Sequence, residues 1–146
     1  MAITCGIYLY DLRQKKFLIC HATHARWDQW SIPKGGKEKD EDTLTAAVRE
    51  LKEETGIRLS DLHVIDTHVL PSVKYQKQNK TLEPFLLLTD TDLSNYKLHC
   101  PVRGNDRFAE VDTWKWVDID IMEKMVHESQ QKNIPAIRKL LNEFSK

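Results

Sequence analysis

The segment 49–54 carries three glutamates, Glu50, Glu53 and Glu54, whose types and spacing could do chemistry. In a helix, the i, i+3 and i+4 spacing places all three side chains on one face. Like charges at this spacing each cost an isolated helix roughly 0.2–0.5 kcal/mol. Arg49 could neutralise the face, but on the helical wheel it points elsewhere. Carboxylate oxygens are hard ligands, so a bound Mg²⁺ or Mn²⁺ would remove the cost.

The wider segment 35–57 has glycines, acids and aliphatic residues at fixed positions. It resembles the Nudix box, which has Gly, five free residues, Glu, seven free residues, Arg-Glu, an aliphatic residue, one free residue, Glu-Glu, one free residue, Gly and an aliphatic residue. The matching positions are Gly35, Glu41, Arg49, Glu50, Leu51, Glu53, Glu54, Gly56 and Ile57. The resemblance implies a single Nudix domain over residues 1–146, of the α/β class, folded as an α/β/α sandwich with a mixed β-sheet.

The resemblance also implies a reaction, in which water attacks one phosphorus of a nucleoside diphosphate linked to another group. Cations are needed to bridge the phosphate oxygens and to lower the pKa of the water. Glu50, Glu53 and Glu54 occupy the catalytic and metal-binding positions. We expect Glu53 to be an indispensable ligand, and Glu50 either to bind the metal ion or to accept a proton. A backbone carbonyl ligand is expected from Lys34 or from Gly35.

The general base varies within the family, and some members supply it from a loop outside the box. Glu110, six residues before Trp116, is the strongest outside candidate for a catalytic and metal-binding role. Asp106 and Glu83 are alternatives. Glu110 could also be an ordinary solvated loop carboxylate, so the base stays open at this point.

Arg49 and Glu41 are expected to support the site. A guanidinium group is a planar fork that can bind a carboxylate through two hydrogen bonds. By resemblance, Arg49 supports the glutamates and Glu41 anchors the loop that leads to the helix. Loss of either side chain would then damage the geometry of the catalytic site.

Residues outside the box narrow the choice of substrate. The segment 30–35 resembles the Trp-x-x-Pro-Lys-Gly pattern of dinucleoside polyphosphate hydrolases, which diphosphoinositol and some RNA-end pyrophosphohydrolases share. Lys34 in this segment could bind a polyphosphate. Tyr75 lies 18 residues beyond Ile57, close to a tyrosine of the diadenosine polyphosphate hydrolases. Its ring could stack on a base.

Further residues agree with this substrate class or depart from it. Lys77 and Lys80 could steer phosphates, and Trp27 could be a second stacking partner. Gly36 stands where the diadenosine enzymes often have His, and Pro71 approaches the proline position of ADP-ribose hydrolases.

We therefore expect a dinucleoside polyphosphate hydrolase, with diadenosine tetraphosphate as the example. The alternatives are an RNA 5′-end pyrophosphohydrolase, an ADP-ribose or nucleotide-sugar hydrolase, and a sanitiser of oxidised nucleoside triphosphates. A different class is a nucleotide-binding Nudix module without activity. Such modules typically lack box carboxylates, and all of them are present here.

Charge balance and composition bound the partners. The chain has 22 basic and 22 acidic side chains and no net charge, so phosphate binding should be local and a broad nucleic-acid surface is disfavoured. No segment approaches the 18 apolar residues of a membrane helix. A cytoplasmic protein with nucleotide substrates, no membrane contact and reduced cysteines is expected. The oligomeric state is left open.

Periodicity predicts the elements that position these residues. One helix is expected at 43–55, with Gly56 ending it. Strands are predicted at 3–10, 17–21, 62–70, 83–89 and 113–117, the first two forming a hairpin, and further helices at 119–129 and 134–144.

Overall fold

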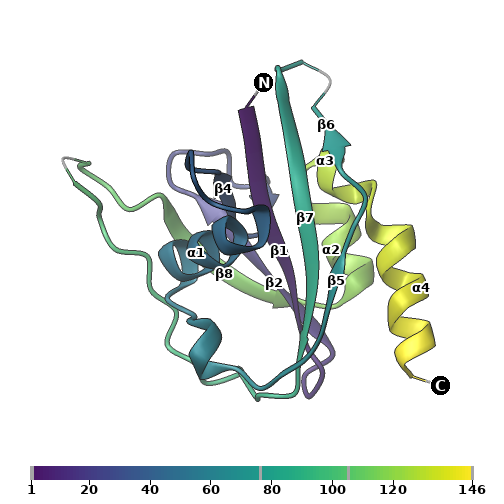
Figure 1. Cartoon of the computed structure of the whole chain (residues 1–146). Coiled ribbons are helices and arrows are strands. Elements are labelled where there is room, and N and C mark those ends of the chain that lie inside the picture. Colours follow the sequence, from purple (N-terminus) through teal and green to yellow (C-terminus); the bar gives the residue numbers. More distant parts are fainter. Residues whose placement is uncertain (1, 76, 105, 146) are drawn as a thin grey trace.

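The fold is built on one mixed β-sheet, seen in a computed structural model that describes residues 2–75, 77–104 and 106–145 (Figure 1). The strands are β1 (Ala2–Asp11), β2 (Lys16–Ala22), β3 (Trp30–Ser31), β4 (Lys34–Gly36), β5 (Val64–Val69), β6 (Val73–Lys74), β7 (Lys80–Thr89) and β8 (Val111–Val117). The main path has the order β3-β2-β1-β7-β5, while β4 pairs with β1, β6 with β7 and β8 with β2. β1 and β7 run parallel and the other pairs are antiparallel, which confirms the mixed sheet and the β1–β2 hairpin.

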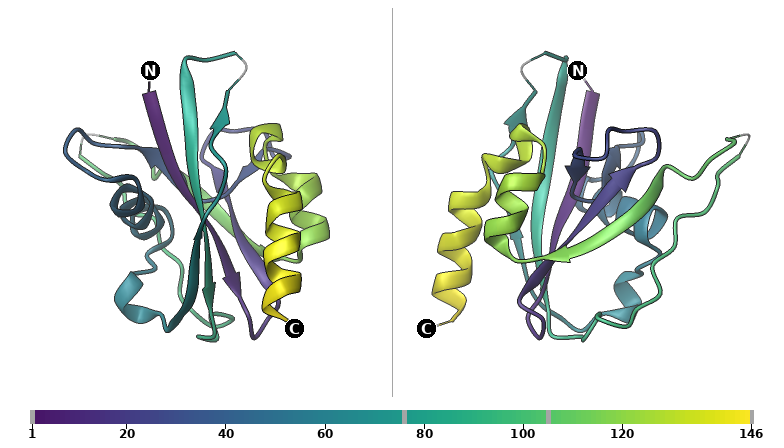
Figure 2. Two further views of the ribbon diagram at one scale, coloured as in Figure 1. Left: turned by 45° about the vertical axis from the view of Figure 1, so that its right-hand side comes forward. Right: turned by 180° about the vertical axis from the view of Figure 1, so that it is seen from behind.

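Helices cover both faces of this sheet (Figures 1 and 2). They are α1 (Thr43–Thr55), α2 (Ile119–Met125), α3 (Glu128–Gln131) and α4 (Ile134–Phe144), with a short 3₁₀ helix, η1, at Leu59–Asp61. α1 lies on one side, and α2, α3 and α4 lie on the other. This arrangement confirms the predicted α/β/α sandwich. Among the described residues, no helix combines the length and the apolar character that a membrane span requires.

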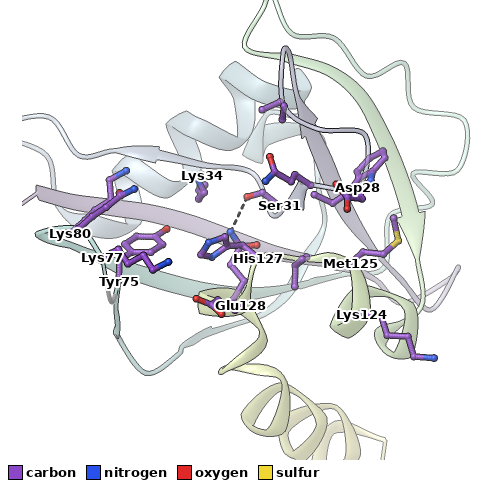
Figure 3. A pocket seen from close by; sticks show the side chains of 17 residues that line it. Asp28, Ser31, Lys34, Tyr75, Lys77, Lys80, Lys124, Met125, His127 and Glu128 are labelled. Carbon is purple, nitrogen blue, oxygen red and sulfur yellow. Dashed lines mark hydrogen bonds between the residues drawn. The ribbon is translucent and has the colours of Figure 1, made fainter.

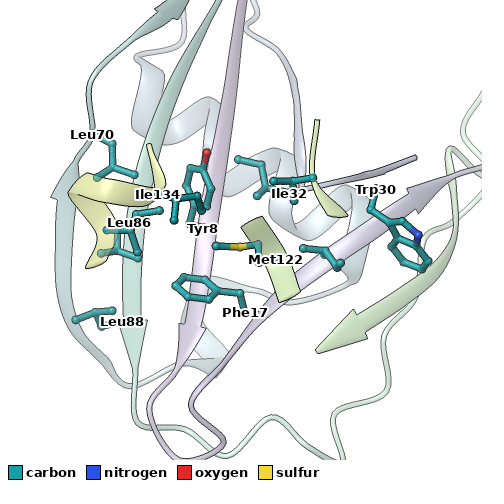
Figure 4. Packing of buried hydrophobic residues seen from close by; sticks show 12 residues of the cluster. Tyr8, Phe17, Trp30, Ile32, Leu70, Leu86, Leu88, Met122 and Ile134 are labelled. Atoms are coloured by element: carbon teal, nitrogen blue, oxygen red, sulfur yellow. The ribbon is translucent and has the colours of Figure 1, made fainter. Parts of the chain in front are cut away.

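Among the described residues, two large hydrophobic cores fill the spaces between the layers, and a third, small cluster contains Cys20, Cys100 and Val111. Side chains of β1 alternate between the two large cores, as the two-residue period of a strand requires. Ile7 and Leu9 pack in the core under α1. Tyr8 belongs to the other core, together with Ile134 of α4 (Figure 4). The predicted free state of the cysteines is confirmed, since Cys5, Cys20 and Cys100 are all buried and unbridged.

The limits of α1 agree with the prediction. Asp42 caps the N-terminus, where its side chain accepts a hydrogen bond of 2.7 Å from the backbone N–H of Thr45. Gly56 ends the helix with φ of 81°, in the left-handed region that favours glycine. The helix that carries the three glutamates is therefore fixed at both ends by local chemistry.

The predicted helix over 119–129 is wrong, because the structure breaks it into α2 and α3. Val126 is extended, with ψ of 158°, and forms a bridge with Trp30. The backbone N–H of His127 donates to the Trp30 carbonyl at 3.1 Å. Pairing with β3 thus replaces a continuous helix, which local periodicity does not reveal.

Candidate active site

Glu50 projects from α1 against the backbone of β4. Its side chain is buried, with 4% of the residue exposed. A Cβ added at Gly35 would lie 2.1 Å from the Cδ atom of Glu50. Only glycine therefore leaves room for this carboxylate, which explains the first residue of the sequence pattern.

Glu54 lies one turn further along α1 and is tied to two strands. The backbone N–H of Lys34 in β4 donates to Glu54 Oε1 at 3.1 Å. The Nε1–H of Trp114 in β8 donates to the Glu54 carbonyl at 2.9 Å. Desolvation by burial raises the pKa of the Glu54 carboxyl from its ordinary 4.5 to about 8, and the bond from Lys34 opposes that rise.

Glu110 completes a group of carboxylates. It directly precedes β8, and its carbonyl accepts a hydrogen bond of 2.9 Å from the backbone N–H of Thr23. Glu50, Glu54 and Glu110 each offer a carboxylate oxygen, and these three atoms lie within 4.8 Å of one another. We call these three residues the carboxylate cluster. The structure thus brings the candidate from outside the box to two of the box glutamates.

Arg49 reaches the glutamates, contrary to the expectation that it points elsewhere on the wheel. Its Nη1 atom donates to Glu50 at 2.9 Å and to Glu53 at 3.0 Å. Its other nitrogens bind both carboxylate oxygens of Glu41, at 2.6 and 2.9 Å, and the Gly36 carbonyl at 2.9 Å. The prediction failed because a helical wheel records the direction of Cβ, whereas an arginine side chain spans a full helical turn. The bidentate pair with Glu41 supports the expected bracing role, which stays a prediction.

Glu53 does not belong to the carboxylate cluster, and its partners are two arginines. Its Oε2 atom accepts from Arg49 and also pairs with Arg103 Nη1 at 2.5 Å. Among the residues that the structure describes, the group within 4.8 Å contains Glu50, Glu54 and Glu110 but not Glu53. Its role as an indispensable ligand stays a prediction.

The carboxylate cluster fits a divalent cation. Glu50 Oε2 is buried and has no hydrogen-bond partner among the described residues. Burial, followed by the charge of Glu53, raises the pKa of Glu50. Buried carboxylate oxygens of this kind need a positive charge to stay ionised, and a hard ion such as Mg²⁺ or Mn²⁺ matches them. The carbonyl groups of Lys34 and Gly35 stay predicted further ligands.

A pocket of about 560 Å³ shares Lys34 with the surroundings of the carboxylate cluster, although no member of the cluster lines it. Four lysines line it, although the whole chain has no net charge: Lys34, Lys77, Lys80 and Lys124. Tyr75, Lys77 and Lys80 lie at one end, and Met125 and Lys124 lie at the other (Figure 3). Lys34 connects the two sites, since its backbone binds Glu54 while the residue lines the pocket.

Tyr75 occupies the pocket with an aromatic neighbour. The rings of Tyr75 and His127 have centroids 6.0 Å apart and an interplanar angle of 63°. The Nζ atom of Lys80 lies 5.5 Å from the Tyr75 ring centroid. Trp27 does not line the pocket and is 84% exposed, so its predicted role in substrate binding stays a prediction.

Sequence reasoning missed three residues at these sites. His127 and Lys124 line the pocket because the chain breaks between α2 and α3, where a continuous helix was expected. Arg103 pairs with Glu53 and Glu110 from the connection between β7 and β8. No spacing pattern marks any of these positions, because each reaches its site through long-range packing.

Comparison with solved structures shows the same fold elsewhere. The crystal structure of a C. elegans Ap4A hydrolase binary complex matches with a TM-score of 0.73 at 21% identity, covering 97% of this chain and 98% of that chain. A bifunctional NMN adenylyltransferase/ADP ribose pyrophosphatase from Francisella tularensis, complexed with AMP and Mn ion, has a TM-score of 0.68 at 20% identity, covering 97% and 41%.

Sequence comparison gives the family. An RNA pyrophosphohydrolase of Bartonella henselae is 31% identical over 141 residues, which cover 89% of this chain and 79% of that protein. The mRNA-decapping enzyme subunit 2 of Saccharomyces cerevisiae is 29% identical over 87% of this chain and 12% of its own length. The sequence model of the NUDIX domain matches residues 2–140. The chain therefore belongs to the Nudix family and is a Nudix hydrolase.

Proposed function

We propose that the chain hydrolyses a phosphoanhydride bond of a dinucleoside polyphosphate such as diadenosine tetraphosphate, with Mg²⁺ or Mn²⁺ as the cofactor. One observation carries this proposal. Lys34 joins the carboxylate cluster, through its N–H bond to Glu54, to a pocket that holds Tyr75 and further lysines. A base in the pocket would therefore have its phosphates directed toward the carboxylates.

The acidic residues and Arg49 have distinct roles in this proposal. Glu50, Glu54 and Glu110 would hold the ion, and Glu53 would join them once Arg103 no longer pairs with it. The ion would supply charge to the phosphate oxygens and lower the pKa of the attacking water. Arg49 fixes the orientation of the glutamates through its bidentate pair with Glu41. The attacking water would give its proton to Glu50 or to Glu110, whichever of the two carboxylates does not bind the ion.

The pocket residues provide affinity for the nucleotide. Tyr75 offers a ring face to the base, which accepts adenine or guanine alike. Lys34, Lys77 and Lys80 neutralise phosphate charge along the chain that joins the base to the cluster. These phosphate contacts involve a few lysines in one pocket. A chain with no net charge favours such local contacts over a broad basic surface.

A second candidate substrate is the 5′-triphosphate end of RNA. It is supported by relatives that are named RNA pyrophosphohydrolases, such as the protein of Bartonella henselae. An RNA end would use the same carboxylates and pocket. Its remaining phosphates would also need basic residues beyond the pocket, which a balanced charge makes less favourable.

A substrate panel tests the proposal. We would compare kcat/KM with Mg²⁺ for diadenosine tetraphosphate, triphosphate-ended RNA, ADP-ribose and an oxidised dGTP. The expected result is the highest value for diadenosine tetraphosphate, and little activity in a Glu53→Gln variant. A higher value for RNA would shift the assignment to the second candidate. Nucleotide binding without hydrolysis of any panel member would indicate a binding module.

A further inference from the structure

Arg103 bridges two carboxylates of the active site from outside the box. Its Nη1 atom pairs with Glu53 Oε2 at 2.5 Å, and its Nη2 atom donates to Glu110 Oε1 at 2.7 Å. A guanidinium fork can hold two carboxylates at once in this way. Arg103 therefore places a positive charge where the proposed function requires a divalent ion and phosphates.

The chain is anchored on both sides of Arg103, which is itself exposed. On one side, the backbone N–H of His99 donates to the Thr55 carbonyl at 2.9 Å, and Cys100 is buried. On the other side, the Glu110 carbonyl accepts from Thr23. Arg103 lies between these anchors, and its side chain is 42% exposed. It can change partners without disturbing either core.

The two arginines at Glu53 differ in how firmly they are held. Both bind the same oxygen, Oε2. Arg49 is also fixed by Glu41 and by the Gly36 carbonyl. The partners of Arg103 among the described residues are the carboxylates of Glu53 and Glu110. A second cation near these carboxylates would repel Arg103, because like charges disfavour one another at short distance.

We propose that Arg103 changes its binding partners when the divalent ion and substrate bind. Before substrate binds, it neutralises Glu53 and Glu110; when the divalent ion and substrate bind, it releases these carboxylates and binds a phosphate oxygen of the substrate. This inference rests on the proposed function, because it takes Glu53 and Glu110 as residues of the metal site. Arg103 thus competes with the ion in the free enzyme and aids substrate in the complex.

Two opposite effects of removing Arg103 test the inference. For Arg103→Ala, we expect Mn²⁺ to bind the free protein roughly three- to tenfold more tightly, because a competing positive charge is lost. We expect KM for diadenosine tetraphosphate to rise about tenfold or more, because a charge-assisted hydrogen bond to phosphate is lost. Mn²⁺ binding would be measured by electron paramagnetic resonance without nucleotide, and KM by steady-state kinetics with saturating Mg²⁺.

Two further variants control the test. Arg103→Lys keeps the charge but not the fork, so it should restore Mn²⁺ affinity to near the natural value and KM only in part. Arg107→Ala removes an exposed arginine of the same connection, for which no ion pair is found among the described residues. It should change neither quantity. Melting temperatures would show that each variant is folded.

The outcomes separate this inference from the proposed function. Weaker Mn²⁺ binding by folded Arg103→Ala would mean that Arg103 only braces the glutamates, and would overturn the inference. Unchanged Mn²⁺ affinity and KM would also overturn it. A natural protein that bound no Mn²⁺ and hydrolysed no panel substrate would instead contradict the proposed function.

Discussion

At the scale of single residues, the space left by Gly35 determines where Glu50 lies. A Cβ at this position would approach Glu50 Cδ to 2.1 Å. We expect Gly35→Ala to displace the carboxylate and to lower kcat/KM by roughly 10²-fold, the cost of a misplacement of about 1 Å. Steady-state kinetics on diadenosine tetraphosphate would measure the loss.

The neighbouring glycine is a matched control for that variant. A Cβ added at Gly36 would meet nothing within 4 Å among the described atoms. Gly36→Ala should therefore keep nearly the full kcat/KM. Equal losses in the two variants would show that the backbone of β4, rather than the space for Glu50, limits activity.

Residue spacing in the sequence predicted the contacts within the box. It could not predict contacts that depend on how distant segments fold. Gly35, Glu50 and Glu54 meet because a helical turn and a short strand convert fixed sequence spacing into fixed geometry. Glu110 was a candidate, and the structure brings it to the cluster. Arg103 could not be predicted, because its position depends on how a long connection folds back over α1.

At the scale of elements, the pair of Glu41 and Arg49 joins α1 to the loop before it. Hydrogen bonds from Arg49 are the main cause that lowers the pKa of Glu41 to about 2 from an ordinary 4.5. The ionised carboxylate is thus favoured in the folded state. Its contribution to stability is fully present above pH 4.5 and is lost as pH falls through about 2.

Because the lowered pKa of Glu41 stabilises the fold only where the carboxylate is ionised, the effect of replacing Glu41 should depend on pH. The difference in melting temperature between the natural protein and Glu41→Gln should be constant above about pH 5 and shrink as pH falls toward 3. Thermal unfolding in the presence of a chelator would measure it. A difference that grew on acidification would contradict the assigned ion pair.

A second element-scale prediction concerns the pocket between the β6–β7 connection and α3. We expect Tyr75→Ala to raise KM for diadenosine tetraphosphate about tenfold, because stacking on one base contributes about 1–3 kcal/mol. Tyr75→Phe should keep most of the affinity, since it keeps the ring. Steady-state kinetics would distinguish the two variants.

Trp27 provides the comparison for this pocket. It lies outside the lining and is 84% exposed, so Trp27→Ala should leave KM unchanged. A rise in KM equal to that of Tyr75→Ala would instead place a base outside the pocket.

Local chemistry explains which elements could be predicted. α1 was predicted at its observed limits because Asp42 and Gly56 are strong local signals. The helix over 119–129 was wrong because the bridge between Val126 and Trp30 is a long-range contact. Residues at that break line one side of the pocket, so the sequence could not predict that part of the pocket either.

At the scale of the whole molecule, Gln130 joins the helical layer to the sheet beside the active site. Its Oε1 atom accepts from the backbone N–H of Ile32 at 2.9 Å, and its carbonyl accepts from the Tyr8 hydroxyl at 2.7 Å. The residue is fully buried. These bonds tie α3 to β1 and to the segment that leads into Lys34.

Replacing Gln130 should destabilise the fold. Gln130→Leu leaves the buried N–H of Ile32 without an acceptor, which costs about 1–3 kcal/mol in the free energy of unfolding. Urea titration would measure it. Gln131→Leu, at a less buried position, should cost less; the reverse order would contradict this role for Gln130.

The central claim is that the glutamates of α1, with buried Glu50 among them, perform metal-dependent hydrolysis of a phosphoanhydride. The most direct measurement is mass spectrometry of the products from diadenosine tetraphosphate in water enriched with heavy oxygen, with Mg²⁺, for the natural protein and Glu50→Gln. We expect ATP and AMP, one of them labelled once, from the natural protein, and a rate reduced by roughly 10²–10⁴-fold in the variant. Labelled products formed at an equal rate by Glu50→Gln, or in excess chelator, would contradict the claim.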